Sequence, residues 1–214
     1  MSSDMELKVF RDKIDKIDSD IVDLIKERMA IVKEVGLYKE SVDDGCFIKS
    51  AREVDMMRDL VESLDGVIDK RVVFNIWRSL IVSANIAEQE LEVFIYNPNK
   101  DAQLVNVLNC YYANLVKIKE INDIEEFLSS GKKGGARILA LTSSVEGSAW
   151  QKVLDSNENL KVFAKIESQL YLLADKPVEK SQNDKFVFFE DGKLVESSED
   201  GQGKFLGVFG VVDK

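Results

Sequence analysis

The sequence contains no histidine, only two cysteines and only two prolines among its 214 residues. Without histidine, Ser-His-Asp and Cys-His catalysis are excluded, and so are most zinc sites. Cys46 and Cys110 are too few for a disulfide framework and lack CxxC spacing, which is typical of a protein in a reducing compartment. No apolar run approaches the roughly 20 residues of a membrane span, and the start MSSDMELK lacks the apolar segment of a secretory signal. We therefore expect a cytoplasmic protein with no metal site and no membrane partner.

Positive charge is also scarce, because 29 lysines and arginines face 39 aspartates and glutamates, for a net charge of −10. This balance disfavours general binding to nucleic acids or anionic membranes. The hydrophobic and charged fractions, 45% and 32%, are ordinary for a globular protein. The length suits one large domain or two small ones. Any cationic site must therefore be a local concentration of charge.

The first candidate element is a long helix over residues 5–40, which has no proline and no internal glycine before Gly36. Apolar residues recur at helical spacing and form a stripe about 120° wide. Arg28 falls inside this stripe and Lys39 lies at its edge, three turns further on. A cation in an apolar stripe is costly unless an anion meets it, so Arg28 either snorkels, pairs with a core carboxylate, or binds an anionic ligand. Arg11 points about 100° away from Arg28. The stripe consists of Ile14, Ile17, Ile21, Leu24, Ile31, Val35 and Tyr38.

A second, shorter helix is predicted over residues 49–64, after a turn at Asp44-Gly45. Ser50 and Glu53 have the spacing of a capping box at its start, which would give Glu53 a purely structural role. The alternative is a role for Glu53 in a binding site.

A third helix is predicted over residues 70–90, with Asp69 as its N-terminal cap. Glu88 borders its apolar face, where the structural alternative is a solvated carboxylate at a helix end. The first helix would be roughly 50 Å long, and the two shorter helices cannot cover its stripe. The economical solution is a dimer in which two long helices pack against each other, so that Arg11 faces the site of the partner.

These helices resemble a known family. The pattern FRDKIDKIDSDIVDLIKERMAIVKEVGLYK, then ARE, then a final helix ending near EQ, is similar to the all-helical (AroQ-type) chorismate mutases over residues 7–91. The resemblance implies a three-helix all-α fold in an intertwined homodimer. It also implies an isomerase that converts chorismate to prephenate in aromatic amino-acid biosynthesis, on the shikimate pathway, without a cofactor.

The resemblance further implies which residues bind the substrate. By analogy with the family, Arg28 and the partner chain's Arg11 would hold the two carboxylates of chorismate. Arg52 would support the site, and Glu53 would accept a hydrogen bond from the ring hydroxyl. The chemistry suits these residue types, because a [3,3] rearrangement needs no nucleophile but does need a dianion held in a chair-like conformer.

The same analogy assigns the catalytic roles to Lys39 and Glu88. Lys39 would contact a carboxylate and the ether oxygen, where negative charge develops as the C–O bond breaks. Glu88 would donate to that oxygen, for which it must be protonated. Two positions depart from the family: Lys49 stands where some members have Asp, and Ala84 where many have a small polar residue.

The second half changes character at Leu91, where strands and helices begin to alternate, as in a small α/β domain. EQELEVFIYNP and LALTSSVEGSAWQKVLDSNENLKVFAKI resemble the junction and first lobe of fused mutase–prephenate dehydratases over residues 91–177. The dehydratases' Glu-Asn-Ser corresponds here to Thr142-Ser143-Ser144, and their Thr-Arg-Phe motif does not occur. We therefore predict two domains, a mutase domain at 1–91 and a non-catalytic α/β domain at 92–214 resembling a truncated dehydratase lobe.

Two other functions remain open on the same fold. A pyruvate-eliminating lyase that acts on isochorismate uses a similar cationic pocket. A catalytically silent protein could instead use the helices for metabolite binding or dimerisation, although the complete set of cations argues against this.

Overall fold

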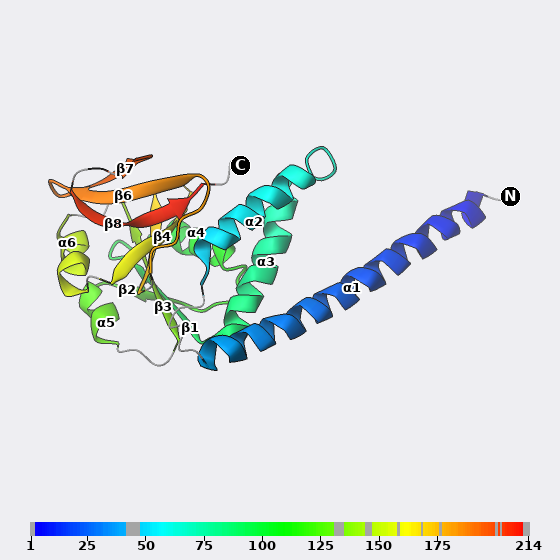
Figure 1. Ribbon diagram of the computed structural model, residues 1–214, viewed down its shortest axis with the longest axis horizontal. Helices are drawn as coiled ribbons and strands as arrows, with labels where there is room; N and C mark the ends of the chain where they lie inside the picture. The colour runs from blue at the N-terminus through cyan, green and yellow to red at the C-terminus, as the bar shows by residue number, and fades with distance from the viewer. Residues whose placement is uncertain are drawn as a thin grey trace.

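The computed structural model describes residues 3–41, 48–130, 135–143, 147–157, 159–167, 169–175, 177–199, 201 and 203–211. Three helices come first in the chain, and an eight-stranded mixed sheet with three further helices follows (Figure 1). The predicted order, a helical region and then an α/β region, is confirmed. Cys46 and residues 131–134 lie outside the described residues.

The helical region consists of α1 (Ser3–Ser41), α2 (Ser50–Ser63) and α3 (Lys70–Glu88). Asp69 caps α3 as predicted, because its side chain accepts a hydrogen bond of 2.8 Å from the backbone N–H of Arg71. The capping box of Ser50 and Glu53, which was one of the two alternatives for Glu53, does not form at the start of α2. The helix begins one residue earlier than that box requires, the N-cap position is Lys49, and no side chain caps it.

Helix α1 extends far beyond the rest of the molecule as an arm, and α3 crosses it near its C-terminal end (Figure 1). Gly36 is buried at this crossing. A Cβ atom at position 36 would lie only 3.3 Å from the Cα of Glu88, so the absence of a side chain lets the two helices approach closely.

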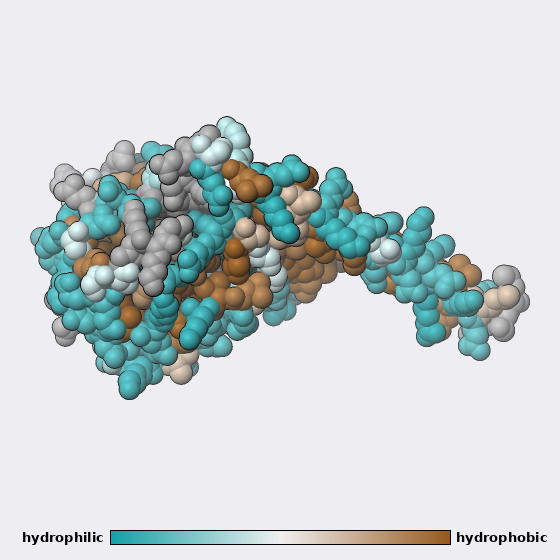
Figure 2. Space-filling view, turned by 90° about the horizontal axis from the view of Figure 1, so that it is seen from below, coloured by the Kyte–Doolittle hydropathy of each residue, from teal (hydrophilic) through white to brown (hydrophobic). Residues whose placement is uncertain are grey.

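Most of the arm has no cover within the single chain. Of the 21 large hydrophobic residues that are exposed in the described part of the chain, 14 lie on α1, and they include every member of the predicted stripe. Figure 2 shows apolar surface gathered where the arm joins the body and in further patches along the arm. Among the described residues, no helix is long and apolar enough to cross a membrane.

The sheet has the order β2-β1-β3-β5-β4-β8-β6-β7. Strand β1 is parallel to β2 and β3, β5 is antiparallel to β3 and β4, β8 is parallel to β4, and β6 is antiparallel to β8 and β7. A hairpin turn joins β6 to β7 with positive φ at Asp191 and Gly192, as a tight hairpin requires. The strands are β1 (Leu91–Tyr96), β2 (Ile118–Ile121), β3 (Ala136–Thr142), β4 (Leu160–Ile166), β5 (Leu170–Asp175), β6 (Asp184–Glu190), β7 (Lys193–Ser197) and β8 (Lys204–Gly210).

Helices cover both faces of the sheet. Successive residues of β3 belong to two different buried clusters, because side chains alternate across a strand. One cluster includes side chains of α5 (Ile124–Ser129) and α6 (Gly147–Ser156), and the other includes side chains of α4 (Ala102–Tyr111). The α4 cluster also contains Ile48 and Val82 from the helical region, so the two regions share part of their core.

Candidate active site

Lys39 and Glu88 form an ion pair between the ends of α1 and α3. The Lys39 Nζ donates to Glu88 Oε2 at 2.6 Å, and the two side chains are only 12% and 9% exposed. The close helix crossing at Gly36 brings these ends together. The two residues predicted to act on the ether oxygen are therefore neighbours, and Glu88 is not a solvated carboxylate at a helix end.

Arg28 lies three turns before Lys39 on α1 and is half-buried. Its Nη1 donates to the backbone carbonyl of Leu80 on α3 at 3.1 Å. No carboxylate in the described part of the chain forms an ion pair with Arg28, so it is not the cation of a buried structural pair. A guanidinium has five N–H donors, which leaves capacity for an anionic ligand here.

Glu53 is held by two side chains of α3 instead of by the start of its own helix. Arg78 Nη1 donates to Oε2 and Asn85 Nδ2 donates to Oε1, each at 3.1 Å, and the Glu53 side chain is 14% exposed. The sequence pattern did not single out Arg78 or Asn85. Their seven-residue separation places them on one face of α3, and an arginine within that apolar helix was the available signal.

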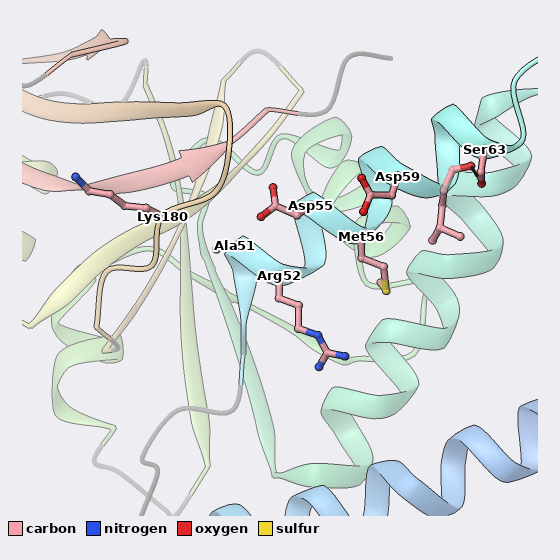
Figure 3. A pocket seen from close by; sticks show the side chains of 8 residues that line it. Ala51, Arg52, Asp55, Met56, Asp59, Ser63 and Lys180 are labelled. Atoms are coloured by element: carbon pink, nitrogen blue, oxygen red, sulfur yellow. Dashed lines mark hydrogen bonds between the residues drawn. The ribbon is translucent and has the colours of Figure 1, made fainter.

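Arg52, next to Glu53 on α2, is exposed and lines an open groove of about 650 Å³. Figure 3 shows its side chain pointing away from α2, toward the side on which α1 runs. The groove has a mixed lining of charged and apolar groups. The lining residues are Ala51, Arg52, Asp55, Met56, Asp59, Leu60, Ser63 and Lys180.

Arg11 does not join the other predicted site residues within one chain. It is exposed on the projecting part of α1. It precedes Arg28 by seventeen positions, which corresponds to about 25 Å along a helix. The two arginines therefore cannot share a site within one chain that has this straight α1.

The two departures from the family pattern have structural places of their own. Lys49 forms an ion pair of 3.7 Å with Glu179, in the segment before β6. Ala84 is buried on α3.

The arrangement offers cations from α1 and α2 and carboxylates from α2 and α3. In the described ranges, no cluster of three or more histidine, cysteine, aspartate or glutamate side chains could hold a metal ion. Such a set of groups suits the binding of an anionic molecule and the stabilisation of developing negative charge.

Comparisons with known proteins agree with the resemblance seen in the sequence. Residues 10–90 match the model of the family "Chorismate mutase type II". The chain is 25% identical over 179 residues to a "Bifunctional chorismate mutase/prephenate dehydratase" of Stutzerimonas stutzeri, and 23% identical over 179 residues to a protein of the same name in Pseudomonas aeruginosa. Each match covers 80% of this chain and 48% of the relative, so the chain spans about half the length of these curated relatives. No solved structure matches the chain significantly.

The matches to the two bifunctional proteins are longer than the helical region, so the similarity continues into the α/β region. Both resemblances seen in the sequence are therefore confirmed: residues 10–90 match the chorismate mutase type II model, and the similarity to the bifunctional proteins extends beyond that region.

Proposed function

We propose that this chain is a chorismate mutase, an isomerase that rearranges chorismate to prephenate in aromatic amino-acid biosynthesis. The observation that carries the proposal is the buried Lys39–Glu88 pair within a region that matches the chorismate mutase type II family. Arg28 lies on the same helix as Lys39 and has no carboxylate partner among the described residues.

In the proposed mechanism, Arg28 and the partner's Arg11 bind the two carboxylates of chorismate and select its chair-like conformer. Glu53 accepts a hydrogen bond from the ring hydroxyl, and Arg52 adds positive charge beside it. Lys39 and protonated Glu88 donate to the ether oxygen as its negative charge grows. A millionfold acceleration requires about 8 kcal/mol, which is within reach of conformer selection plus two fixed donors in a site sheltered from water.

We also infer that the active form is a homodimer. The apolar stripe of α1 is exposed in the single chain, and contiguous apolar surface of this extent marks an interface. The α1 of a second chain would cover that stripe, and it would also cover the groove beside Arg52. The same packing would carry the partner's Arg11 to the site. Within one chain, Arg11 lies about 25 Å from Arg28 along α1.

For the α/β region we propose a non-catalytic role, with the division between domains at residues 91 and 92. The motive is the replacement of the dehydratases' Glu-Asn-Ser by Thr142-Ser143-Ser144, of which Ser144 lies outside the described residues. A cytoplasmic location and the lack of nucleic-acid partners stay predictions from composition.

The proposal is tested with purified protein and chorismate. The loss of chorismate absorbance is followed together with phenylpyruvate, measured before and after acid conversion of the prephenate formed. We expect chorismate to disappear above the buffer rate, and phenylpyruvate to appear only after acid. No loss of chorismate would contradict the mutase proposal, and phenylpyruvate formed enzymatically at neutral pH would contradict the non-catalytic role. Release of pyruvate from isochorismate in a parallel assay would favour the lyase.

A further inference from the structure

Arg78 lies where the helical region meets the α/β region, and its guanidinium contacts both. On one side Nη1 donates to Glu53 Oε2 at 3.1 Å. On the other side Nε donates to the backbone carbonyl of Tyr111 at 3.1 Å. Tyr111 is the last residue of α4, so a single side chain links a predicted site residue to the second region of the protein.

The aromatic ring of Tyr111 fixes the guanidinium further. The Arg78 Cζ lies 4.1 Å from the centre of this ring, the separation of a close cation–π stack. Tyr112 stands edge-on to Tyr111, with ring centres 5.1 Å apart, and packs in the core cluster of α4 and β1. Burial raises the pKa of both tyrosines, so they stay neutral beside the Arg78–Glu53 pair. The position of the guanidinium is therefore set by α4 and not by α3 alone.

The hydrogen bonds from Arg78 and Asn85 leave Glu53 able to bind a ligand. Each carboxylate oxygen has two lone pairs, and the donors from α3 take one on each oxygen. The bonds from Arg78 and Asn85 fix the direction of the remaining lone pairs. A guanidinium does this better than an ammonium, because its planar fork can hold two acceptors in a fixed relation.

We propose that Arg78 is a positioning residue which holds Glu53 in the orientation that accepts the substrate's ring hydroxyl, and that the end of α4 sets its position. The inference rests on the proposed function and extends it, since it couples substrate affinity to the α/β region. Arg78 acts through Glu53 and does not itself touch the substrate.

The test measures KM and kcat for chorismate in full-length Arg78→Lys. Lysine keeps the charge but cannot make the stack and both hydrogen bonds, so Glu53 is no longer held in place. We expect KM to rise about tenfold, as for loss of one hydrogen bond to a charged group, while kcat stays within about twofold. Circular dichroism and the thermal midpoint check that the variant is folded.

A second pair of variants tests the coupling to α4 at a residue remote from the substrate. Tyr111→Leu removes the stacking ring and keeps apolar bulk, and we expect KM to rise by about threefold. Tyr111→Phe keeps the ring and is the matched control, with KM unchanged. Equal KM values for Tyr111→Leu and Tyr111→Phe would overturn the coupling, and they can be measured even where Arg78→Lys does not fold.

A double-variant cycle separates positioning from a general structural role. In a Glu53→Gln background, Arg78→Lys should raise KM by less than about twofold, because the oriented carboxylate is already gone. Multiplication of the two KM effects would show that Arg78 acts independently of Glu53. If the wild type turns over chorismate but folded Arg78→Lys has an unchanged KM, this inference alone is overturned. Absence of turnover in the wild type overturns the proposed function as well.

Discussion

At the scale of single residues, the most informative feature is an acid that has two possible roles. Glu88 accepts a hydrogen bond from Lys39 at 2.6 Å in a site that is about nine-tenths buried. As a carboxylate it satisfies the lysine but would repel negative charge developing on the ether oxygen. As a protonated acid it could donate to that oxygen. The ionisation of this one group should therefore govern catalysis.

We predict that a neutral donor at position 88 supports mutase activity as well as the wild-type acid does, or better. Glu88→Gln keeps a donor at this position and cannot become a carboxylate that repels the developing charge. Its kcat/KM for chorismate should therefore hold or rise relative to that of the wild type. The measurement is kcat/KM for both proteins under the same conditions, with circular dichroism to check the fold. A large loss of kcat/KM in folded Glu88→Gln would show that donation from this position is not what catalysis needs.

Arg28 offers a second test at this scale. Arg28→Ala should lower kcat/KM by about a hundredfold or more, because removal of a cation from a sheltered anion site costs on the order of 3 kcal/mol. The fold should survive, since the protein itself loses only the hydrogen bond to the Leu80 carbonyl, worth about 1 kcal/mol, and a long contact to the Met29 sulfur.

The control for Arg28→Ala is Lys26→Ala on the same helix. Lys26 pairs with Asp23 at the surface, where both side chains are 71% exposed, so neither activity nor stability should change measurably. Unfolding of Arg28→Ala, in place of inactivation, would favour a structural role for this arginine.

At the scale of elements, the crossing of α1 over α3 sets the geometry of the Lys39–Glu88 pair. Gly36→Ala should raise helix propensity by about 1 kcal/mol, but its methyl group would press on the Glu88 backbone at 3.3 Å. We expect a thermal midpoint close to that of the wild type, and a kcat/KM reduced by about tenfold as the pair is displaced.

A substitution with the opposite effect on helix propensity separates the effect of propensity from the effect of the close helix crossing. Ala30 is exposed on α1, so Ala30→Gly should cost about 1 kcal/mol of stability and leave kcat/KM unchanged. A fully active Gly36→Ala protein would show that the close approach of the helices is not needed for the site.

The elements themselves were largely predictable, because their signals are local. Apolar periodicity and the Asp69 cap identified the first three helices to within a few residues. The local signals left two alternatives open where a distant partner decides the outcome. Glu53 has capping-box spacing, yet its carboxylate binds Arg78 and Asn85, because paired donors on α3 offset the cost of burying a charge better than a helix cap does.

The same difference between local signals and distant partners holds for the site. The residues that the family pattern carries could be selected from the sequence, and the structure places Lys39 beside Glu88. The contact between Arg78 and Tyr111 could not be predicted, since Tyr111 lies 33 residues further along the chain and meets Arg78 only through the packing of α4. Single-sequence patterns carry no information on such contacts.

At the scale of the whole molecule, the two regions are joined through their cores and the arm is not. Ile48 and Val82 are buried against the sheet, at 3% and 0% exposure, and Arg58 Nη2 on α2 donates to the carbonyl of Val211 at 2.8 Å. The α/β region therefore buttresses the helices that carry Glu53 and Glu88. The stripe along α1 has no such cover within the single chain, and this exposure is the observation behind the proposed homodimer.

We predict that Arg11→Ala and Arg28→Ala, each nearly inactive alone, recover activity when the two proteins are unfolded and refolded together. In a mixed dimer, one site combines the intact Arg28 of one chain with the intact Arg11 of the other, and the second site carries both defects. Random pairing makes half of the dimers mixed and half of their sites intact, so about a quarter of wild-type activity should return. Differently tagged chains, purified through both tags, give the mixed dimer directly and should show about half of wild-type activity. Mixed dimers without activity would mean that each site is built from one chain. In that case α1 would have to fold back to bring Arg11 over the 25 Å or so that separate it from Arg28.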